Sequence, residues 1–333
     1  MIQPASLTPP SVWITGGAGF IGRALTKSLT QQGVTVVRVD HRRVHDGFDG
    51  FECTFDDLES ALVLSRLSEA RTVVHLAGHV GVRHVVRDPA AVGQKNSGLT
   101  LQLLRVLERL PLDLRPRLFA ASTSEVYLPK PGPLSERDPV RSGDERGRWS
   151  YAASKIASER RFDEAHTGGL GPVHLRFFNV VGPGQDSAQG MMLPTFVEHA
   201  LAGRALPVHG DGSSVRTLAH VDDVAETLAS LVMKDDVPAG PLNIGGTARA
   251  SVLEIARCVL ALSHSRSGIV HVDPKQVVGP AFEDIAWREP DLARLAALDI
   301  PVPKRSLEAI VRDTLDRHTD SSREDDACAS RAF

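Results

Sequence analysis

The sequence predicts a doubly wound α/β fold, in which helices cover both faces of a parallel sheet. Three observations predict it. Short β-branched runs alternate with helical stretches through the first half of the chain. A glycine-rich turn follows the first of these runs and opens the first helix. With 333 residues, the chain is also long enough for one large core or two coupled domains.

The expected elements alternate between the two periodicities. The first expected helix, 23–32, ends before Gly33, and the second, 99–110, carries an apolar stripe. The expected strands are rich in Val, Ile and Leu, which suits a sheet buried on both faces. They lie at 12–14, 34–39, 72–76, 118–121 and 173–178.

The pattern of predicted segments changes after residue 178. Segments become shorter, and Gly and Pro become more frequent. We therefore divide the chain into a dinucleotide-binding domain at 11–178 and a smaller mixed α/β substrate-binding region at 179–317, interleaved with the first domain. Residues 318–333 are so polar that we expect a disordered tail.

Composition excludes several classes of partner. The net charge of −3 provides no basic surface for nucleic acid, and no apolar run reaches the length of a membrane span. Residues 1–10 are polar and contain proline, so we expect no signal peptide. The cysteines Cys53, Cys258 and Cys328 follow no metal or disulfide spacing, which predicts a reduced, cytoplasmic setting.

Three histidines raise the question of a metal site: His75, His79 and His84. The first two straddle an expected strand end and a glycine-bearing loop, and no carboxylate stands at ligand spacing. We therefore expect ordinary histidines and no bound metal.

The glycine-rich turn predicts a dinucleotide site of the Rossmann type. Gly16, Gly19 and Gly22 have G-x-x-G-x-x-G spacing between the first strand and the first helix. Glycines allow a tight turn, a close approach of the backbone to a pyrophosphate, and close helix–strand packing. The N-terminus of the helix then presents N–H groups and a partial positive charge to the phosphates.

An acidic residue indicates which dinucleotide is bound. Asp40 ends the second strand, where its carboxylate would accept hydrogen bonds from the ribose hydroxyls and repel a 2′-phosphate. This predicts NAD, although Arg42 and Arg43 keep NADP open. A third strand end, Leu76-Ala77-Gly78, offers small residues to the same cofactor.

Tyr151 and Lys155 form the expected catalytic pair. They are four residues apart, so on a helix they share one face. A free phenol titrates near pH ~10, and a fixed positive charge beside it favours the phenolate. Such a tyrosine can take the proton of a sugar hydroxyl while hydride leaves the same carbon.

Together these motifs resemble the extended short-chain dehydrogenase/reductase family over about residues 12–315. Segments at 176–184, 208–212, 220–224, 243–245 and 288–291 resemble its nucleotide-sugar branch. The resemblance implies that Asn179, Arg216 and Arg288 contact the diphosphate or the sugar of a nucleotide-sugar. The expected cofactor site then comprises Gly16, Gly19, Phe20, Ile21, Gly22, Asp40, Leu76, Ala77, Gly78, Asn96, Tyr151 and Lys155.

The segment Thr123-Ser124-Glu125 decides among the reactions of this branch. In the family, the residue at Thr123 hydrogen-bonds the sugar O4, although a strand-end threonine can also simply cap a turn. The 4-epimerases typically lack an acid two residues later, and 4,6-dehydratases of the dTDP-glucose type resemble Thr-Asp-Glu. Thr-Ser-Glu is similar to UDP-glucuronate decarboxylases, and also to GDP-mannose dehydratases, whose NADP preference Asp40 speaks against.

The resemblance therefore predicts an NAD-dependent UDP-glucuronate decarboxylase, with catalytic Thr123, Ser124, Glu125, Tyr151 and Lys155. A nucleotide-sugar 4,6-dehydratase is the alternative, and a 4-epimerase is third. A hypothesis outside the enzymes is a redox-sensing regulator that binds dinucleotide without turnover. Such proteins usually lack the Tyr/Lys pair. The family also implies a homodimer, through 99–110 and the helix of Tyr151.

Overall fold

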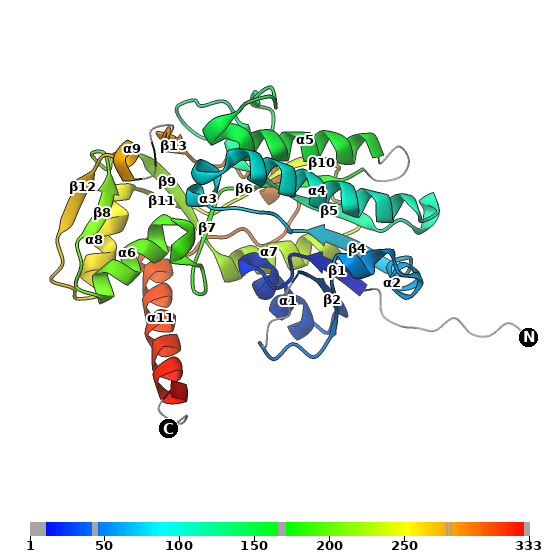
Figure 1. The fold of residues 1–333 in the computed structure, drawn as a ribbon, viewed down its shortest axis with the longest axis horizontal. Coiled ribbons are helices and arrows are strands. Elements are labelled where there is room, and N and C mark those ends of the chain that lie inside the picture. Colours follow the sequence, from blue (N-terminus) through cyan, green and yellow to red (C-terminus); the bar gives the residue numbers. More distant parts are fainter. Residues whose placement is uncertain (1–10, 42–45, 166–170, 278, 280–281, 330–333) are drawn as a thin grey trace, which may run out of the picture.

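The computed structural model describes residues 11–41, 46–165, 171–277, 279 and 282–329, without the side chains of 82, 84 and 319–329. A seven-stranded sheet lies at its centre, with strand order β10-β6-β5-β4-β1-β2-β3, and all its pairings are parallel. Helices cover both faces, with α4 and α5 on one side and α1 and α7 on the other (Figure 1). The predicted Rossmann-type α/β class is confirmed.

Five of the first six strands lie where the sequence predicts them, and β3, which it does not predict, follows β2 with no described helix between them. The strands are β1 (Ser11–Thr15), β2 (Val36–Val39), β3 (Phe51–Cys53), β4 (Ala70–His75), β5 (Arg117–Thr123) and β6 (Val173–Phe177). The helices are α1 (Phe20–Gln31), α2 (Ala61–Leu67), α3 (Val82–Arg87), α4 (Pro89–Glu108) and α5 (Ser150–Ala165).

Two helices begin earlier than predicted, and each has a local reason. Helix α1 begins at Phe20, immediately after Gly19, because the glycine turn leads directly into the first helical turn. Helix α4 begins at Pro89 because Asp88 caps it, accepting a hydrogen bond from the Ala91 N–H at 3.0 Å. Asp followed by Pro is an N-terminal signal. Here it extends the predicted helix by three turns.

The second half of the chain adds the seventh strand and a separate lobe. Strand β10 (Gly240–Ile244) joins the edge of the main sheet beside β6, and α7 (Val221–Met233) packs against α1. A four-stranded sheet contains β7 (Asn179–Val181), β9 (Val215–His220), β11 (Ala248–Ser251) and β13 (Trp287–Arg288). The lobe also holds β8 (Leu206–His209), β12 (Ile269–Val272), α6 (Met192–Leu201), α8 (Val252–Leu262) and α9 (Pro274–Val277). Helix α10 (Ala293–Ala296) instead packs against β10 of the main sheet.

The C-terminal segment differs from its prediction. Helix α11 (Leu307–Ala329) runs past His318, through the segment for which composition predicts disorder, and extends away from the lobe (Figure 1). No Gly or Pro interrupts these residues, so the polar sequence is compatible with a continuous helix. Residues 330–333 lie outside the described residues, and no described helix is long and apolar enough to cross a membrane.

The parallel strands bring the predicted site residues to one edge. The carboxyl ends of β1, β2, β4 and β5 are followed, respectively, by Gly16, Asp40, Leu76 and Ser124. In open α/β sheets, ligands bind outside the carboxyl ends of the strands. Glycine turn, acidic strand end and catalytic segment therefore share one side of the sheet.

Candidate active site

The glycine turn is shaped by backbone contacts that exclude side chains. The Gly16 N–H donates to Val39 O at 2.8 Å, and Gly16 has a φ of +72°, a region that favours glycine. A Cβ on Gly16 would lie 2.7 Å from Ala77 N, and one on Gly22 would lie 2.2 Å from Gly16 O. Gly19 caps α1 with no side-chain hydrogen bond, so the first-turn N–H groups of Phe20 and Ile21 face no side-chain cap.

Asp40 lies beside this turn, as predicted. Its Oδ2 accepts a hydrogen bond from the Ala18 N–H at 3.0 Å, and its Oδ1 accepts one from the His41 N–H at 2.8 Å. The side chain is 9% exposed. A carboxylate with two oxygens and about four lone-pair positions keeps capacity for ribose hydroxyls. Arg42 and Arg43, which keep NADP open, lie outside the described residues.

Gly78, in the third strand end, lies beside Asn96 and Lys155. A Cβ on Gly78 would lie 3.3 Å from Lys155 Nζ and 3.4 Å from Asn96 Oδ1. Asn96 is buried, accepts from the His79 N–H at 2.7 Å and donates to Ser154 Oγ at 3.4 Å. The Leu76 N–H donates to Thr15 O at 2.9 Å, which ties this strand end to the glycine turn. The space that Gly78 leaves is therefore lined by predicted cofactor residues.

Tyr151 and Lys155 lie on α5, and Lys155 Nζ donates to Ala121 O at the end of β5, at 3.0 Å. Burial lowers the pKa of the Lys155 ammonium to about 8, although Glu159 opposes this shift. The Tyr151 phenol differs from its prediction: burial and the Glu125 carboxylate raise its pKa, and the nearby Arg288 guanidinium opposes them. Within the protein itself, the phenol is therefore the protonated form at neutral pH.

Glu125 lies between two guanidinium groups. Arg148 Nη1 donates to its Oε2 at 2.8 Å, and Arg288 Nη1 lies 3.4 Å from its Oε1. All three side chains are at least 85% buried. Burial alone would raise the pKa of Glu125, but the charges of Arg148, Arg288 and Arg141 outweigh it and hold the pKa below its usual value. Glu125 is therefore a carboxylate.

Thr123 and Ser124 have different partners. The Thr123 hydroxyl accepts a hydrogen bond from the Glu125 N–H at 3.2 Å, which caps the turn and leaves its own proton to donate elsewhere. Ser124 Oγ accepts hydrogen bonds from Arg288 Nη2 at 2.7 Å and from Arg288 Nε at 3.2 Å. The structure thus gathers Thr123, Ser124, Glu125, Tyr151 and Arg288 into one cluster.

The other two predicted substrate residues lie on the neighbouring small sheet. Asn179 Nδ2 donates to Thr217 O at 3.3 Å. Arg216 lies opposite Arg288 in the β9–β13 pairing, but its guanidinium binds Asp284 Oδ1 at 2.7 Å and Ile285 O at 2.6 Å. Of the predicted substrate-binding arginines, only Arg288 contacts the catalytic cluster.

Sequence reasoning missed a buried network behind Lys155. Glu159 accepts two hydrogen bonds from Arg176, at 3.0 and 2.8 Å, and one from Ser122 Oγ at 2.5 Å. Arg176 also stacks over the Tyr127 ring, 4.9 Å from its centroid. Glu159 follows Lys155 by the same four-residue interval that separates Lys155 from Tyr151, and this spacing could have revealed it.

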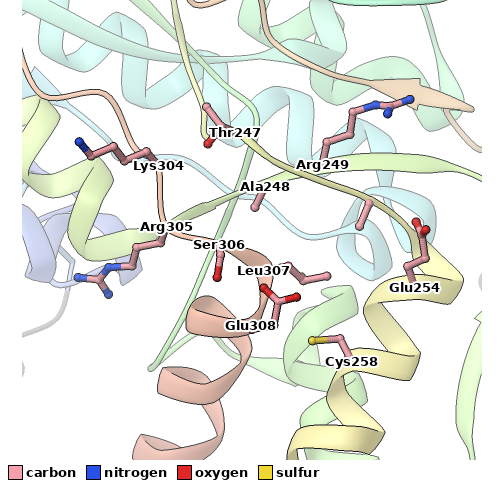
Figure 2. Close-up of a pocket in the computed structure, with 11 residues that line it drawn as sticks. Thr247, Ala248, Arg249, Glu254, Cys258, Lys304, Arg305, Ser306, Leu307 and Glu308 are labelled. Carbon is pink, nitrogen blue, oxygen red and sulfur yellow. The ribbon is translucent and has the colours of Figure 1, made fainter.

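The hollow shown in Figure 2 lies elsewhere. It has a volume of about 640 Å³ beside the start of α11, and its lining comes from residues 247–250, 254, 258 and 304–308. None of these is a predicted site residue. Lys304, Arg305 and Glu308 give it a mixed charge. We therefore locate the candidate site at the sheet edge, by its chemistry.

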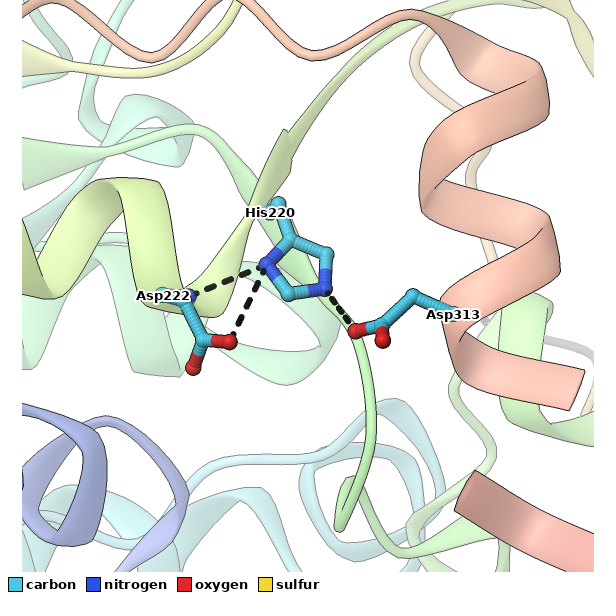
Figure 3. Close-up of side chains that lie close together, drawn as sticks. All are labelled: His220, Asp222 and Asp313. Atoms are coloured by element: carbon cyan, nitrogen blue, oxygen red, sulfur yellow. Dashed lines mark hydrogen bonds and ion pairs between the residues drawn. The ribbon is translucent and has the colours of Figure 1, made fainter. Parts of the chain in front are cut away.

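Three side chains could in principle hold a metal: His220, Asp222 and Asp313 (Figure 3). The His220 Nε2–Asp313 Oδ2 distance is 2.8 Å, and Arg305 Nη1 donates to His220 Nδ1 at 2.8 Å. Arg317 pairs with both carboxylates. Both imidazole nitrogens and both carboxylates already have hydrogen-bond or ion-pair partners. The cluster therefore suits a structural role, in which it stabilises the packing of β9 against α11. His75 is also buried, 2.7 Å from Thr15 Oγ1, and the His84 side chain lies outside the described residues.

Comparisons with known proteins agree with this geometry. Residues 12–245 match the model of the NAD dependent epimerase/dehydratase family. The chain is 32% identical to UDP-N-acetyl-alpha-D-glucosaminuronate decarboxylase of Bacillus cytotoxicus, over 91% of this chain and 95% of that protein. It is 30% identical to UDP-glucuronic acid decarboxylase 1 of Danio rerio, over 86% of this chain and 67% of that protein. MoeE5 in complex with UDP-glucuronic acid and NAD superposes with a TM-score of 0.79, at 28% identity, over 93% of this chain and 99% of that chain.

Proposed function

Because this chain belongs to the NAD dependent epimerase/dehydratase family, we propose that it is an NAD-dependent decarboxylase of UDP-glucuronate. The family match bears out the predicted family and its cofactor. The reaction oxidises C4 of the sugar and then releases the C6 carboxylate as CO₂. Its product is a UDP-4-ketopentose, or UDP-xylose where hydride returns to C4.

One observation carries the choice of a uronate. At the catalytic cluster, the guanidinium groups of Arg148 and Arg288 face the single carboxylate of Glu125. The local excess of positive charge is buried, where it attracts a further anion strongly. Arg288 presents two N–H groups to one Ser124 oxygen, a fork that suits a substrate carboxylate equally well. A neutral 6-hydroxyl would leave this excess unmatched.

The residues of the cofactor edge fit NAD. Gly16 and Gly22 pack backbone against backbone and keep the turn tight, and Gly78 presents no side chain beside Lys155 and Asn96. A glycine turn of this kind lets a dinucleotide diphosphate approach the backbone closely. Asp40 offers a carboxylate to the ribose hydroxyls, and the start of α1 offers N–H groups to the diphosphate. NAD, when bound, supplies the acceptor for the hydride that leaves C4.

Tyr151 takes the proton from the C4 hydroxyl. The Arg288 guanidinium already opposes the effect of burial on the pKa of Tyr151. In our proposal, the positive charges of Lys155, one helical turn away, and of bound NAD would add to this effect and favour the phenolate. Thr123 donates its hydroxyl proton to the same sugar oxygen, and this hydrogen bond strengthens as negative charge develops there.

The 4-ketone formed in this step is β to the carboxylate. When the C5–C6 bond breaks, its electron pair enters the enolate of the 4-ketone, and CO₂ leaves. Thr123 and Tyr151 hydrogen-bond the enolate oxygen, and a proton then adds at C5. Glu125 stays ionised beside Arg148, so in our proposal it orients the C5 face and a proton donor such as water, and it is not itself the acid.

The other reactions of the branch fit these residues less well. A 4,6-dehydratase needs an acid to protonate the departing 6-hydroxyl, and the predicted position of that acid is Ser124, which is bound to Arg288. A 4-epimerase has no use for a carboxylate at the C5 side. Both remain distinguishable by their products.

A second substrate is favoured by one comparison. The relative from Bacillus cytotoxicus acts, by its name, on the 2-acetamido analogue of the same uronate. The chemistry at C4, C5 and C6 is identical for the two sugars, so the same cluster serves both. We propose UDP-glucuronate as the substrate and UDP-N-acetylglucosaminuronate as the second candidate.

The experiment is a product analysis. The purified protein is incubated with NAD and, separately, with UDP-glucuronate, UDP-N-acetylglucosaminuronate, UDP-glucose and UDP-N-acetylglucosamine. Loss of CO₂ from either uronate supports the proposal, and the relative kcat/KM of the two uronates identifies the substrate. Loss of water from a hexose would establish a dehydratase, and an isomer of unchanged mass would establish an epimerase.

We also propose that the protein is a cytoplasmic homodimer and that the boundary between its two interleaved domains lies at residue 178. Helices α4 and α5 lie side by side on one face of the sheet, and Leu101 on α4 is 39% exposed (Figure 1). Two such pairs would form a four-helix interface. Light scattering should give twice the mass of the chain, and a value of one chain would contradict the dimer.

A further inference from the structure

Arg148 occupies an unusual position for an arginine outside the predicted site. It lies in the short turn Gly147–Trp149 that leads into α5, three residues before Tyr151, and it is 8% exposed. Trp149 and Phe282 flank its guanidinium, at 4.7 and 6.0 Å from the ring centroids. A cation this deeply buried is expected to have a specific anionic partner.

That partner is Glu125. Arg148 Nη1 donates to Glu125 Oε2 at 2.8 Å, the length of a charge-assisted hydrogen bond. Among the described residues no partner is found for the buried Arg148 Nε. The ion pair with Glu125 is thus the main interaction of this guanidinium, and it joins the turn before Tyr151 to the end of β5.

Arg288 contacts the same carboxylate differently. Its Nη1 lies 3.4 Å from Glu125 Oε1, whereas its Nη2 and Nε lie 2.7 and 3.2 Å from the neutral Ser124 hydroxyl. The Arg288 guanidinium is therefore only loosely paired with Glu125. It can exchange a neutral hydroxyl for an anion without breaking a strong ion pair.

We propose that Arg148 is a positioning residue that retains Glu125, so that Arg288 stays available for the substrate carboxylate. The inference rests on the proposed uronate substrate. Among the described residues, Arg288 is the other guanidinium within hydrogen-bonding range of the Glu125 carboxylate, whereas Arg141 Nε donates to the Glu125 backbone carbonyl at 3.1 Å. Without Arg148, Glu125 would compete with the substrate for the same guanidinium fork.

The first test compares two ligands by calorimetry on the protein loaded with NADH, which cannot accept hydride from C4, so no turnover occurs. In Arg148→Met, the affinity for UDP-glucuronate should fall about tenfold, while the affinity for UDP-glucose should change less than about twofold. Arg148→Lys keeps the charge and should recover most of the loss. If Arg148→Met weakens both ligands equally, or neither, the proposal is overturned.

A double variant separates positioning from folding. In Arg148→Met/Glu125→Gln, no carboxylate competes for Arg288, so UDP-glucuronate affinity should return to within about threefold of the unmodified protein. A merely structural role of Arg148 would leave the double variant as weak as the single one, which would contradict the proposal. Arg117→Met, at the opposite end of β5, is the matched control, because Arg117 donates to the backbone carbonyls of Lys234 and Asp235.

The outcome is independent of the reaction itself. Ligand binding is measured without turnover, so an enzyme that releases no CO₂ from either uronate would refute the proposed function. The ratio of the two affinities would still report on Arg148. Conversely, normal decarboxylation by the unmodified protein, together with an unchanged ratio in Arg148→Met, would refute only the role of Arg148.

Discussion

The two halves of the candidate site differ in the groups that form them: backbone forms most of the first half, and charged side chains form the second. The cofactor edge is mainly a backbone surface. Gly16 and Gly22 leave no room for a Cβ, and Gly78 leaves open the space beside Lys155 and Asn96. The sugar edge is a cluster of charged side chains, in which Glu125 lies between Arg148 and Arg288. Shape therefore governs the first half and charge balance the second. Substitutions at the cofactor edge should act through steric conflict. Substitutions at the sugar edge should act through changes of pKa and of substrate affinity.

The largest effect is expected at the junction of the two halves. Tyr151→Phe removes the proton acceptor and should lower kcat by at least about a hundredfold, while the protein still binds NAD in calorimetry. Tyr127 is the only other tyrosine, and its hydroxyl donates to Asn243 Oδ1 at 2.7 Å. Tyr127→Phe is the matched control and should retain most of the activity. Equal activity of Tyr151→Phe and the unmodified protein would refute the mechanism.

At the cofactor edge, a steric clash alone should be enough to weaken NAD binding. In Gly22→Ala the new Cβ would meet Gly16 O at 2.2 Å, so the turn must shift. NAD affinity should then fall by more than about tenfold. Gly98→Ala, in α4 with open space around it, is the control and should leave affinity unchanged. Normal NAD binding by Gly22→Ala would contradict the role of the turn.

The sugar edge and its helix should respond to charge and pH. Burial already lowers the pKa of Lys155 to about 8, and Glu159 opposes that shift. Glu159→Gln removes the opposing charge, so the pKa of Lys155 should fall further. The loss of kcat/KM at alkaline pH, where Lys155 loses its proton, should then begin at lower pH.

The same substitution should also lower stability. Arg176 would be buried without its carboxylate, at a cost of about 3 to 5 kcal/mol in the free energy of unfolding. Glu164→Gln, on the exposed side of α5, controls for the helix. An unchanged alkaline limb in a folded Glu159→Gln protein would show that Glu159 does not influence Lys155. Urea unfolding checks the stability.

The smallest effect is expected at Asp40. Asp40→Asn keeps a hydrogen-bond acceptor for the Ala18 N–H but removes the negative charge. The preference for NAD over NADP should therefore shrink by about tenfold, mainly through tighter NADP binding. Titration of both dinucleotides measures the ratio. An unchanged ratio would assign the discrimination to other residues.

Local patterns explain why the cofactor edge was predictable. Strand, glycine turn, helix and Asp40 follow one another within thirty residues. Backbone geometry requires the glycines, and the carboxylate at the end of the second strand completes a local pattern. Tyr151 and Lys155 were predictable for the same reason, since one helical spacing relates them. The Asp88–Pro89 signal was equally local and would have given the true start of α4.

The sugar edge depends on contacts that no local pattern encodes. Arg288 is more than 160 residues from Ser124 in the sequence, yet it donates to it at 2.7 Å. The raised pKa of Tyr151 also arises from packing, because burial and Glu125 oppose the expected effect of Lys155. Charge balance in a buried cluster follows from the assembled fold. The sequence shows only which charges are available.

Isotope release tests the central claim most directly. UDP-glucuronate labelled with ¹³C at C6 is incubated with the protein and NAD, and the gas and the nucleotide-sugar are analysed by mass spectrometry. Our account predicts that the label leaves as ¹³CO₂ and that the product is an unlabelled UDP-pentose or UDP-4-ketopentose. A product that keeps the label, whether dehydrated or epimerised, would contradict it.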